Sequence, residues 1–579
     1  MCGIAGIIGS NANPEVLRQM LTAQQHRGPD ATGTFYETDI ALGHNRLSII
    51  DLSEDANQPF YSQDENYVLV YNGEIYNYLE LREELKNTYT FKTTSDTEVL
   101  LAAYLTWGAD CLKYFNGMFS FAIYNKKTKT VFAARDRFGV KPFYYAHHDD
   151  CFYFASEIKT LLAAGVPNIP NEKVWASYLA FGSYGMPTET FYQGIQQLEP
   201  GCQASIFQKQ VVKKRWYHFE QAVHKQPVLD TEEEIIAYYT ALLIDSISLR
   251  FRADVPVGVN CSGGLDSSTL LTFIKLTQDA TACNAYSFYT GDERYDELPW
   301  VKKLVKTSGC PLRPVLFDDE MARTNFTAMC ALQDEPFGGI PTMAYAAIFK
   351  QARQEGVSVL LDGQGMDEQW AGYDYYKNLI EGPNTPTATI QGVKKSPLRP
   401  NVLATHFIEK AEKPVYPEPF DNAMQNVQYR DLFFTKIPRA LRFNDRVSMA
   451  ASTELREPFL DYRLVEFAFA QHSKFKIKEG VHKYMVRKIV DGYVEETITL
   501  APKRPLQTPQ REWLANELRP LVENMVNILK NSSYKNWFDI AILEEELERY
   551  FDGDQDASFH IWQWMNLAEL LATEKNNNE

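Results

Sequence analysis

The stretch Val255-Pro-Val-Gly-Val-Asn-Cys-Ser-Gly-Gly-Leu-Asp-Ser-Ser268 decides how the second half of this chain folds. An extended apolar run ends at Cys261, and a Gly-rich turn then leads into the helix-forming stretch 267–274. Three further strand-like runs alternate with helical stretches, at residues 284–289, 313–317 and 357–361. Repeated units of strand, turn and helix predict a parallel sheet covered by helices. From about residue 400 the chain reads mainly helical.

The first 200 residues show a different, mixed pattern of short strands and helices. Runs 67–71 and 118–124 are strand-like, and Asn13 followed by a proline is a typical helix start. Ser95-Asp-Thr-Glu98 has the form of a capping box ahead of an apolar helical run. Turn-forming and polar stretches suggest a boundary near residue 220. We therefore predict one domain over residues 1–220 and a second over residues 221–579.

The composition is that of a folded, acidic protein. Of the 579 residues, 45% are hydrophobic and 23% are charged, and 58 Lys and Arg against 75 Asp and Glu give a net charge of −17. That surplus repels nucleic acids and anionic membranes, although a locally basic pocket for a small anion is compatible with it. The eight cysteines include no CxxC pair, and the sequence has no signal-peptide pattern and no 18-residue apolar run. We predict a soluble, cytoplasmic protein that binds neither nucleic acid nor membrane.

The turn Ser262-Gly-Gly-Leu-Asp-Ser-Ser268 has the chemistry of an anion site. Its backbone N–H groups, its hydroxyls and the following helix N-terminus can cradle phosphate groups. It lacks the lysine of the GxxxxGK[ST] pattern, so a Walker-type site is not indicated. The alternative is a tight strand-to-helix turn in which the glycines only give clearance.

A second turn, Asp362-Gly-Gln-Gly-Met-Asp-Glu368, also follows a strand. Parallel strands end at the same edge of a sheet, where α/β proteins bind their ligands, so we expect the two turns to meet there. Asp266 and Asp367 would then offer carboxylate oxygens to Mg²⁺, with phosphates completing its ligand shell. The alternative for Asp367 and Glu368 is a solvated acidic turn.

The amino terminus offers a nucleophile. Removal of Met1 before a small residue would give Cys2 a free α-amine, and such an amine has a pKa of about 7.7–8.0 and can take the thiol proton. A chance cysteine is the alternative. Four stretches in which polar residues interrupt strand or turn sequence favour the functional interpretation; they lie at 26–30, 44–48, 71–77 and 95–96.

Together with Cys2, these stretches resemble the class II glutamine amidotransferases, whose N-terminal-nucleophile domain hydrolyses glutamine to ammonia. The resemblance spans residues 2 to about 200. It implies that the Cys2 thiol attacks the side-chain amide of glutamine. It also implies that the Asn72 side chain and the Gly73 N–H form the oxyanion hole.

The same resemblance implies how the rest of glutamine is held. Arg46 would bind the α-carboxylate in a bidentate pair, and Asp96 would bind the α-ammonium. Glu74 belongs to the same implied site. The alternatives are an ordinary ion pair at Arg46 and a favourable first-turn acid of a helix at Asp96.

The Ser262–Ser268 turn resembles the pyrophosphate loop of the ATP pyrophosphatases. A glutaminase followed by this loop resembles the glutamine-hydrolysing asparagine synthetases over nearly the whole chain, with further matches at 444–450, 454–461 and 482–483. The resemblance implies an N-terminal-nucleophile αββα sandwich followed by a parallel-sheet α/β synthetase domain with a helical C-terminal part, which combines the α+β and α/β classes. It implies ATP as co-substrate with Mg²⁺, and Lys483 over the phosphates. The implied nucleotide contacts are Asn260, Ser262, Gly263, Gly264, Leu265, Asp266, Ser267, Ser268, Thr290, Asp362 and Gly363.

The implied acceptor residues carry one departure from this family. Gln364, Asp367 and Glu368 would activate the acceptor carboxylate, but the best-characterised members have Glu where this chain has Gln364. Glutamine keeps the hydrogen-bonding shape and loses the charge, so it cannot act as a base or attract Mg²⁺. Gln at this position also occurs in the wider family. The departure therefore weakens only the assignment of aspartate as the acceptor.

The leading hypothesis is a ligase that converts aspartate, ATP and glutamine to asparagine, AMP, pyrophosphate and glutamate. An alternative keeps this chemistry with another carboxylate, such as a uronic acid of a surface polysaccharide. A β-lactam-forming relative needs no ammonia, so the retained glutamine-site residues disfavour it. Intact Cys2 and Asp266 disfavour a sensing or scaffold protein with inactive sites. The oligomeric state stays open, with a homodimer as one option.

Overall fold

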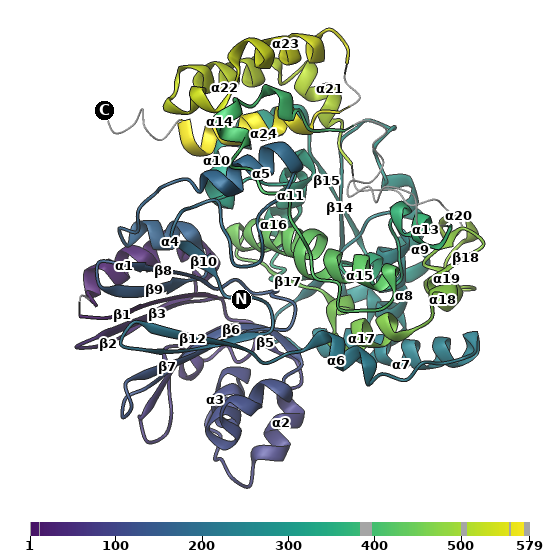
Figure 1. Ribbon diagram of the computed structural model, residues 1–579. Helices are drawn as coiled ribbons and strands as arrows, with labels where there is room; N and C mark the ends of the chain where they lie inside the picture. The colour runs from purple at the N-terminus through teal and green to yellow at the C-terminus, as the bar shows by residue number, and fades with distance from the viewer. Residues whose placement is uncertain (1, 11, 382–395, 500–506, 555–556, 573–579) are drawn as a thin grey trace.

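The computed structural model describes residues 2–10, 12–381, 396–499, 507–554 and 557–572. Its N-terminal part contains two six-stranded antiparallel sheets that stack face to face (Figure 1). The first has the order β10-β8-β9-β1-β3-β2, with β1 (Gly3–Ile8), β2 (Ala31–Glu37), β3 (Ile40–Arg46), β8 (Tyr144–His148), β9 (Cys151–Ala155) and β10 (Ile195–Gln197). The second has the order β12-β11-β7-β6-β5-β4, with β4 (Phe60–Tyr61), β5 (Tyr67–Ile75), β6 (Gly117–Asn125), β7 (Thr130–Arg135), β11 (Cys202–Phe207) and β12 (Gln210–Arg215).

Helices cover the outer face of each sheet. Between the sheets, Ile4 and Ile8 of β1 pack with Val68 and Val70 of β5, since alternate residues of a strand face the same side. Helices α1 (Pro14–Ala23) and α4 (Ile158–Ala163) pack on the first sheet, and α2 (Tyr78–Leu85) and α3 (Asp96–Trp107) on the second. The predicted αββα sandwich is confirmed.

A parallel five-stranded sheet forms the centre of the second part. Its order is β15-β14-β13-β16-β17, with β13 (Val257–Asn260), β14 (Ala285–Tyr289), β15 (Leu312–Leu316), β16 (Val359–Leu361) and β17 (Glu454–Arg456). Val259 and Leu361 face a core shared with α7 (Glu232–Arg250), α8 (Leu265–Thr277) and α9 (Leu298–Ser308). Leu360 faces the opposite core with α10 (Asp319–Gln333), α11 (Ile340–Gln354) and α16 (Lys436–Ala450). The four strands expected at 255–261, 284–289, 313–317 and 357–361 are all members of this sheet.

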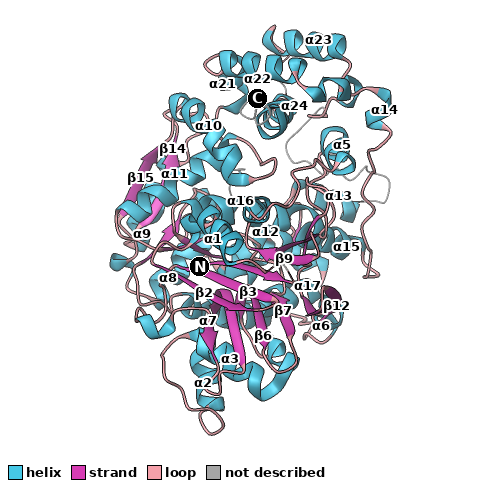
Figure 2. Cartoon of the chain, turned by 90° about the vertical axis from the view of Figure 1, so that its left-hand side faces the viewer, coloured by secondary structure: helices cyan, strands magenta, loops and turns pink. Residues whose placement is uncertain are grey.

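The remaining elements are mostly helices, as predicted beyond residue 400. Figure 2 shows α21 to α24 grouped at one end of the molecule, away from the sandwich. The remaining helices and strands are α5 (Glu172–Phe181), α6 (Phe219–His224), α12 (Met366–Gln369), α13 (Asp374–Glu381), α14 (Thr405–Ile408), α15 (Ala423–Arg430), α17 (Tyr462–Ala470), α18 (Ser473–Lys476), α19 (Tyr484–Ile489), α20 (Glu496–Thr499), α21 (Gln510–Ala515), α22 (Arg519–Asn531), α23 (Ile540–Phe551), α24 (Phe559–Leu567) and the hairpin β18 (Ile477–Lys478) and β19 (Val481–His482). Among the helices that the structure describes, none combines the length and apolarity needed to cross a bilayer.

Two local predictions of helix starts have different outcomes. Asn13 caps α1 as expected, because its side-chain oxygen accepts from the backbone N–H of Glu15 at 2.8 Å. The predicted capping box at α3 is wrong. The Glu98 carboxylate accepts instead from the backbone N–H groups of Lys92 and Thr93, at 3.0 and 2.7 Å, and the Ser95 hydroxyl makes no hydrogen bond within the described chain. Glu98 therefore fixes the preceding turn and not the helix terminus.

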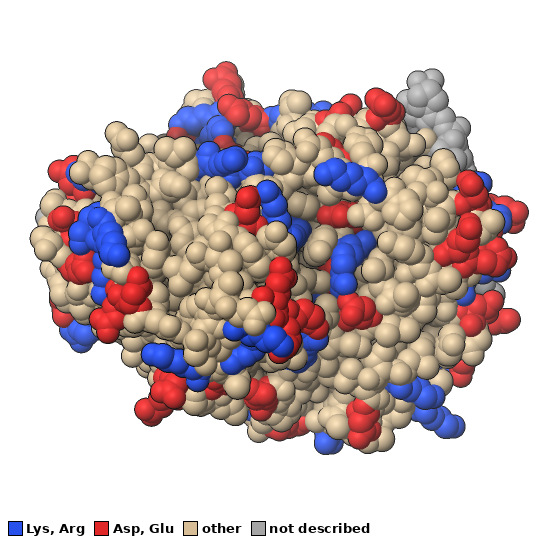
Figure 3. Space-filling model, turned by 90° about the horizontal axis from the view of Figure 1, so that it is seen from below, with Lys and Arg blue, Asp and Glu red and all other residues tan. Residues whose placement is uncertain are grey.

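The two parts of the chain share a buried interface. Leu47 and Phe138 of the first part belong to the same apolar core as Phe433 and the helices of the second. Polar contacts also cross this interface, since the Asn116 side chain donates to Asp461 at 2.9 Å. On the outer surface viewed from below, acidic and basic side chains are interspersed (Figure 3).

Candidate active sites

Cys2 lies where four segments of the sandwich converge. It directly precedes β1, while β5 carries Asn72, Gly73 and Glu74. Arg46 ends β3, and Asp96 begins α3. The structure therefore brings together the residues predicted for the glutamine site, although they are far apart in the sequence.

The Asn72 side chain lies against the nucleophile. Its Oδ1 accepts from the Cys2 backbone nitrogen at 3.0 Å, and its Nδ2 is buried without a hydrogen-bond partner among the described residues. An unused buried donor is costly unless a ligand completes it, so Nδ2 suits a developing oxyanion. Gly73 has no room for a side chain, because a Cβ there would lie 2.2 Å from the Met118 carbonyl oxygen. Burial raises the pKa of the Cys2 thiol, and the nearby Arg46 charge opposes this.

Arg46 is buried with neutral partners. Its Nη1 donates to the Ser53 carbonyl at 2.6 Å and to the Asn57 side chain at 2.8 Å, and its Nη2 donates to the Asp51 carbonyl. No carboxylate lies within ion-pairing distance of it in the described chain. A buried cation held by neutral oxygens is suited to bind a substrate carboxylate.

Asp96 and Glu74 are acids in an apolar setting. Asp96 accepts from the Tyr71 hydroxyl at 2.8 Å and from the Ile75 N–H at 2.9 Å. Burial raises the pKa of Asp96 to about 6, and burial together with the carboxylates of Glu454 and Asp96 raises the pKa of Glu74 well above its usual value. Both acids would gain from a bound ammonium group.

Two residues of the second part reach this site, and the sequence interpretation gave them no role. Arg456 of β17 lies 3.8 Å from the Glu74 carboxylate, and its Nε contacts Glu454 at 2.5 Å. Both belong to the stretch 454–461, which resembles the corresponding stretch of the synthetases. That resemblance indicates a functional stretch, but a single sequence does not reveal that β17 ends beside β5.

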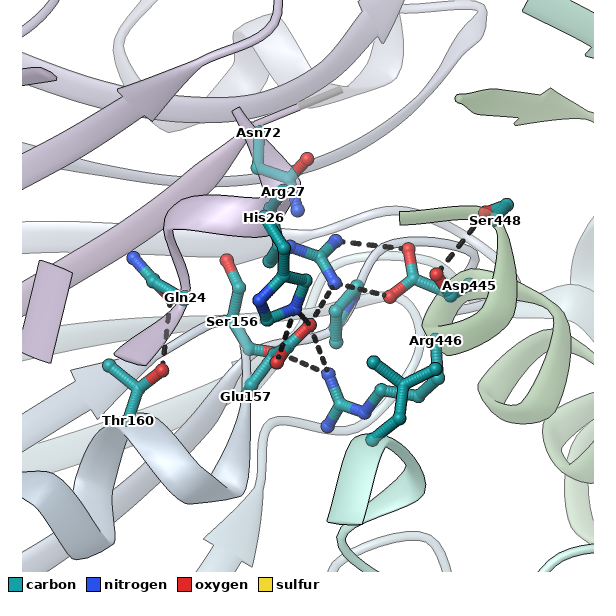
Figure 4. Close-up of polar contacts among 12 residues, drawn as sticks. Gln24, His26, Arg27, Asn72, Ser156, Glu157, Thr160, Asp445, Arg446 and Ser448 are labelled. Atoms are coloured by element: carbon teal, nitrogen blue, oxygen red, sulfur yellow. Dashed lines mark hydrogen bonds and ion pairs between the residues drawn. The ribbon is translucent and has the colours of Figure 1, made fainter. Parts of the chain in front are cut away.

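The Arg27 side chain contacts Asp445 of helix α16 (Figure 4). Its Nε donates to the Cys2 carbonyl at 3.0 Å, and its other nitrogens contact Asp445 of α16 at 2.8 and 3.1 Å. Glu157 accepts from the same guanidinium at 2.8 Å and lies 3.3 Å from Arg446. This buried network was also missed, although Arg27 and Asp445 lie in motifs singled out from the sequence.

The Ser262–Ser268 turn forms at the carboxyl end of β13 and opens α8, as expected. Ser267 Oγ donates to the Gly264 carbonyl at 3.1 Å, and Ser268 Oγ donates to the same carbonyl at 2.7 Å. Ser262 Oγ lies 3.2 Å from Ser267 Oγ. These hydrogen bonds hold the turn around the start of α8, where backbone N–H groups favour an anion.

Lys483 lies between the two carboxylates predicted to bind metal. Its Nζ is 2.5 Å from Asp266 Oδ1 and 2.5 Å from Asp367 Oδ1. Burial lowers the pKa of Lys483, but the two carboxylates outweigh it and hold the pKa above its usual value. Two carboxylates that converge on one cation are a donor set that fits Mg²⁺, which takes one or two carboxylates and completes its shell with waters and phosphates. In the described chain, no cluster of three metal-binding side chains occurs.

Asp362 is held between the ends of β13 and β16. It accepts from the Tyr345 hydroxyl at 2.6 Å, and that hydroxyl accepts from the Asn260 side chain at 2.6 Å. Burial raises the pKa of Asp362, while hydrogen bonds from Tyr345 and Gln364 oppose the increase. Gln364 therefore lies against a carboxylate of its own turn.

A cavity of about 680 Å³ gathers most of the predicted nucleotide residues. Predicted residues in its wall are Asn260, Ser262, Gly263, Gly264, Leu265, Asp266, Ser267, Asp362, Gly363, Gln364, Asp367 and Lys483. Thr290 and Ser268 are outside this wall. Thr290 instead donates to Asp296, which lines the cavity, and Ser268 turns inward to the Gly264 carbonyl.

A second cavity, of about 1150 Å³, lies between the two parts of the chain. Val140 and Tyr144 of the sandwich line it, as do Asp445 and Arg446 of α16. Gln364 belongs to the walls of both cavities, whereas Glu368 faces only the larger one and accepts from the Tyr373 hydroxyl at 2.6 Å. The predicted acceptor residues therefore lie where the two cavities adjoin.

The fold and these sites define a glutamine amidotransferase domain joined to a parallel-sheet synthetase. Residues 1–217 match the glutamine amidotransferase domain family, and residues 239–572 match the asparagine synthase family. The chain belongs to the asparagine synthase family.

Curated relatives cover all or much of the chain. The glutamine-hydrolysing asparagine synthetase 1 of Bacillus subtilis is 29% identical over 100% of this chain and 99% of the relative. A putative glutamine-hydrolysing asparagine synthetase 2 of Methanocaldococcus jannaschii is 37% identical over 65% of this chain and 76% of the relative. The amidase chyE of Penicillium rubens is 26% identical over 95% of each chain.

Proposed function

We propose that this protein amidates aspartate to asparagine, using ATP and ammonia released from glutamine. Glutamate, AMP and pyrophosphate would be the other products. The general activity, an asparagine synthetase-type amidotransferase that depends on glutamine, follows from the family. The acceptor, the cofactors and the residue roles below are our inferences.

The observation that carries the glutamine half is a complementary pair of unpaired buried charges beside Cys2. Arg46 has no carboxylate partner and Asp96 no ion pair in the described chain. Leaving such groups buried costs several kcal/mol, about 3–5 for a broken pair, unless a ligand completes them. A free α-amino acid supplies one carboxylate and one ammonium, so glutamine fits both.

Cys2 is the proposed nucleophile of this half. After removal of Met1, its α-amine takes the thiol proton and the sulfur attacks the glutamine amide carbon. Asn72 Nδ2 and the Gly73 N–H stabilise the oxyanion, ammonia leaves, and water hydrolyses the glutamyl thioester to glutamate. Glu74 and Asp96 hold the α-ammonium during these steps.

The cavity of about 680 Å³ is the proposed ATP site. The acceptor carboxylate attacks the α-phosphorus, and pyrophosphate leaves over the Ser262–Ser268 turn. Ammonia then attacks the acyl adenylate and displaces AMP. Lys483 stabilises the charge on the phosphates, and Asp266 and Asp367 would hold Mg²⁺, which when bound neutralises the phosphate charge.

Ammonia needs a protected route between the two sites, because in neutral water most of it is protonated and not nucleophilic. The cavity of about 1150 Å³ supports such a route. Its walls include Asp445, which contacts Arg27 and, through it, the Cys2 carbonyl. They also include Gln364 and Glu368 of the synthetase turn.

Aspartate is the proposed acceptor because the Bacillus subtilis relative, which aligns with 100% of this chain, is named an asparagine synthetase. Gln364 favours a second candidate, the same amidation of another carboxylate such as a uronic acid of a surface polysaccharide. The Gln364 side chain is neutral, so it does not by itself select aspartate over another carboxylate. The boundary at residue 220, the cytoplasmic location and the oligomeric state stay predictions.

The Cys2→Ala variant tests the two-site scheme. We expect it to lose glutamine-dependent amidation and to keep ammonia-dependent amidation, since only the ammonia source is removed. Product formation is measured with glutamine and then with saturating ammonium, at equal ATP, Mg²⁺ and aspartate. Equal loss with both nitrogen sources would refute the assignment of Cys2. An AMP signal that never depends on aspartate in wild type, with intact glutaminase turnover, would refute the acceptor.

A further inference from the structure

The glutamine site is completed by a side chain that belongs to the other half of the chain. Arg456 is fully buried at the end of β17. Its Nε is fixed on Glu454, and its Nη1 donates to the carbonyls of Arg250 and Arg252 at 2.7 and 2.9 Å. Those carbonyls lie at the end of α7, where the helix dipole favours a cation. The guanidinium is therefore rigidly held by the synthetase part.

The third guanidinium nitrogen faces the glutamine site. Arg456 Nη2 lies 3.8 Å from Glu74 Oε2, which is an ion pair without a hydrogen bond. Neither atom has a hydrogen-bond partner among the described residues. The Glu74 oxygen is thus oriented by charge and keeps its capacity to accept from a substrate N–H.

The backbone of the same residue belongs to the synthetase site. Leu361 and Arg456 are paired across β16 and β17, and the Asp362 N–H donates to the Arg456 carbonyl at 2.9 Å. Asp362 begins the turn that carries Gln364 and lines the proposed ATP cavity. Arg456 therefore contacts both sites: its carbonyl accepts from Asp362 of that turn, and its guanidinium lies beside Glu74.

We propose, on the basis of the proposed function, that Arg456 is a positioning residue for glutamine hydrolysis, which orients the Glu74 carboxylate toward the α-ammonium of glutamine. The charged side chains that face Glu74 among the described residues are Asp96, Glu454 and Arg456. Asp96 and Glu454 disfavour the ionised form of Glu74, and Arg456 favours it. Arg456 also lowers the pKa of Asp96, against the effect of burial. Both acids of the α-ammonium site therefore depend on this arginine.

The test is the glutaminase pH profile of Arg456→Gln. Loss of the positive charge raises the pKa of Glu74 and Asp96, so the acidic limb of kcat/KM for glutamine moves to higher pH. Each unit of that shift lowers the ionised fraction about tenfold on the acidic side. We expect kcat/KM at pH 7 to fall at least about tenfold, mainly through KM. Arg456→Lys keeps the charge and should restore most of the wild-type profile.

The matched control is Arg430→Gln. Arg430 is also a buried arginine of the synthetase part, and it is paired with Asp431 of the same part at 2.9 Å. It should leave the glutaminase profile unchanged. Ammonia-dependent amidation by Arg456→Gln serves as the second readout, and it should stay within about twofold of wild type because ammonia bypasses the glutamine site.

The outcomes separate this inference from the proposed function. An acidic limb that stays in place in Arg456→Gln overturns the inference, as does an equal loss of glutamine-dependent and ammonia-dependent amidation, which indicates a merely structural role. If wild type and Arg430→Gln release no glutamate from glutamine, the proposed function fails and the inference fails with it. A shifted limb that is restored by Arg456→Lys supports it.

Discussion

At the scale of single residues, the proposed glutamine site is marked by buried charged side chains that have no ion-pair partner among the described residues. Buried ionic groups in a folded protein are normally paired, because an isolated one costs several kcal/mol. Arg46 and Asp96 have only neutral hydrogen-bond partners among the described residues. The sequence predicted both as substrate contacts. Their environment supports that prediction and disfavours the ordinary surface pair that was the alternative for Arg46.

The pH dependence of glutamine hydrolysis follows from the same residues. Burial raises the pKa of Asp96 to about 6, and the α-ammonium of glutamine requires the ionised form. We expect protonation of Asp96 to lower kcat/KM for glutamine by about tenfold per unit below that pH, in addition to the loss caused by protonation of the Cys2 α-amine, because protonated Asp96 cannot bind an ammonium. The profile is measured between pH 5 and 8 by glutamate release. A profile that stays flat down to pH 5 would contradict the role of Asp96.

Gln364 is the residue that decides between acceptors. If aspartate is the acceptor, Gln364→Glu restores the usual charge of the family and should preserve or raise asparagine synthesis. If the acceptor is another acid, the added charge should weaken its binding by about 1–3 kcal/mol through repulsion in a desolvated site. The measurement is aspartate-dependent AMP release by wild type and variant. A loss of that signal in Gln364→Glu, with unchanged glutaminase turnover, would argue against aspartate.

At the scale of elements, the synthetase site is built from two turns that follow adjacent parallel strands. β13 and β16 are neighbours in the sheet, so the turns after them meet, and Lys483 joins them through Asp266 and Asp367. The alternative of a solvated acidic turn is disfavoured, since Asp367 contacts a buried lysine and Glu368 is itself buried.

The Asp266→Asn variant tests this element. It removes one of two carboxylates proposed to hold Mg²⁺ and should abolish AMP formation, while glutamine hydrolysis stays measurable because Cys2 lies in the other part. AMP and glutamate are quantified in parallel from one reaction. Normal AMP formation would show that the metal assignment is wrong. Simultaneous loss of glutamate release would show that the two sites are not chemically separate.

At the scale of the whole molecule, buried ion pairs join the two halves of the chain. Arg27 of the sandwich and Asp445 of α16 are 418 residues apart in the sequence and contact each other at 2.8 Å. Burial alone would raise the pKa of Asp445, but the Arg27 charge outweighs it and keeps the pKa below its usual value. Asp445 is therefore ionised, and it anchors the arginine that holds the Cys2 carbonyl.

Asp445→Asn should weaken this connection. We expect the free energy of unfolding of the coupled halves to fall by about 3–5 kcal/mol, because the change breaks a buried ion pair. Urea unfolding followed by intrinsic fluorescence measures the effect. The control is Asp150→Asn, which breaks an exposed pair with Lys209 and should have a much smaller effect, because solvent screens exposed charges. Equal effects of the two variants would show that the buried pair contributes little.

The sequence by itself determined the fold class and predicted two sets of site residues, most of which the structure brings together. Strand–turn–helix periodicity and the Gly-rich turn at 262–268 are local signals, because hydrophobic pattern and turn chemistry act within about ten residues. The structure bore out the αββα sandwich, the parallel sheet and the cap at Asn13. The predicted capping box at Ser95 is wrong, because the Glu98 carboxylate accepts from the backbone of the preceding turn instead. Thr290 was expected at the nucleotide and lies outside the cavity wall.

Only the tertiary structure decided which half completes which site. Arg27, Asp445, Glu454 and Arg456 lie in stretches that the sequence marked as important, yet their pairing depends on contacts across hundreds of residues. A single sequence carries no record of such distances, because the charge of an arginine is the same whether it faces water or a buried carboxylate. Burial and partner choice arise when the sandwich packs against the parallel sheet. That packing places β17 of the synthetase part against Glu74, in the wall of the proposed glutamine site.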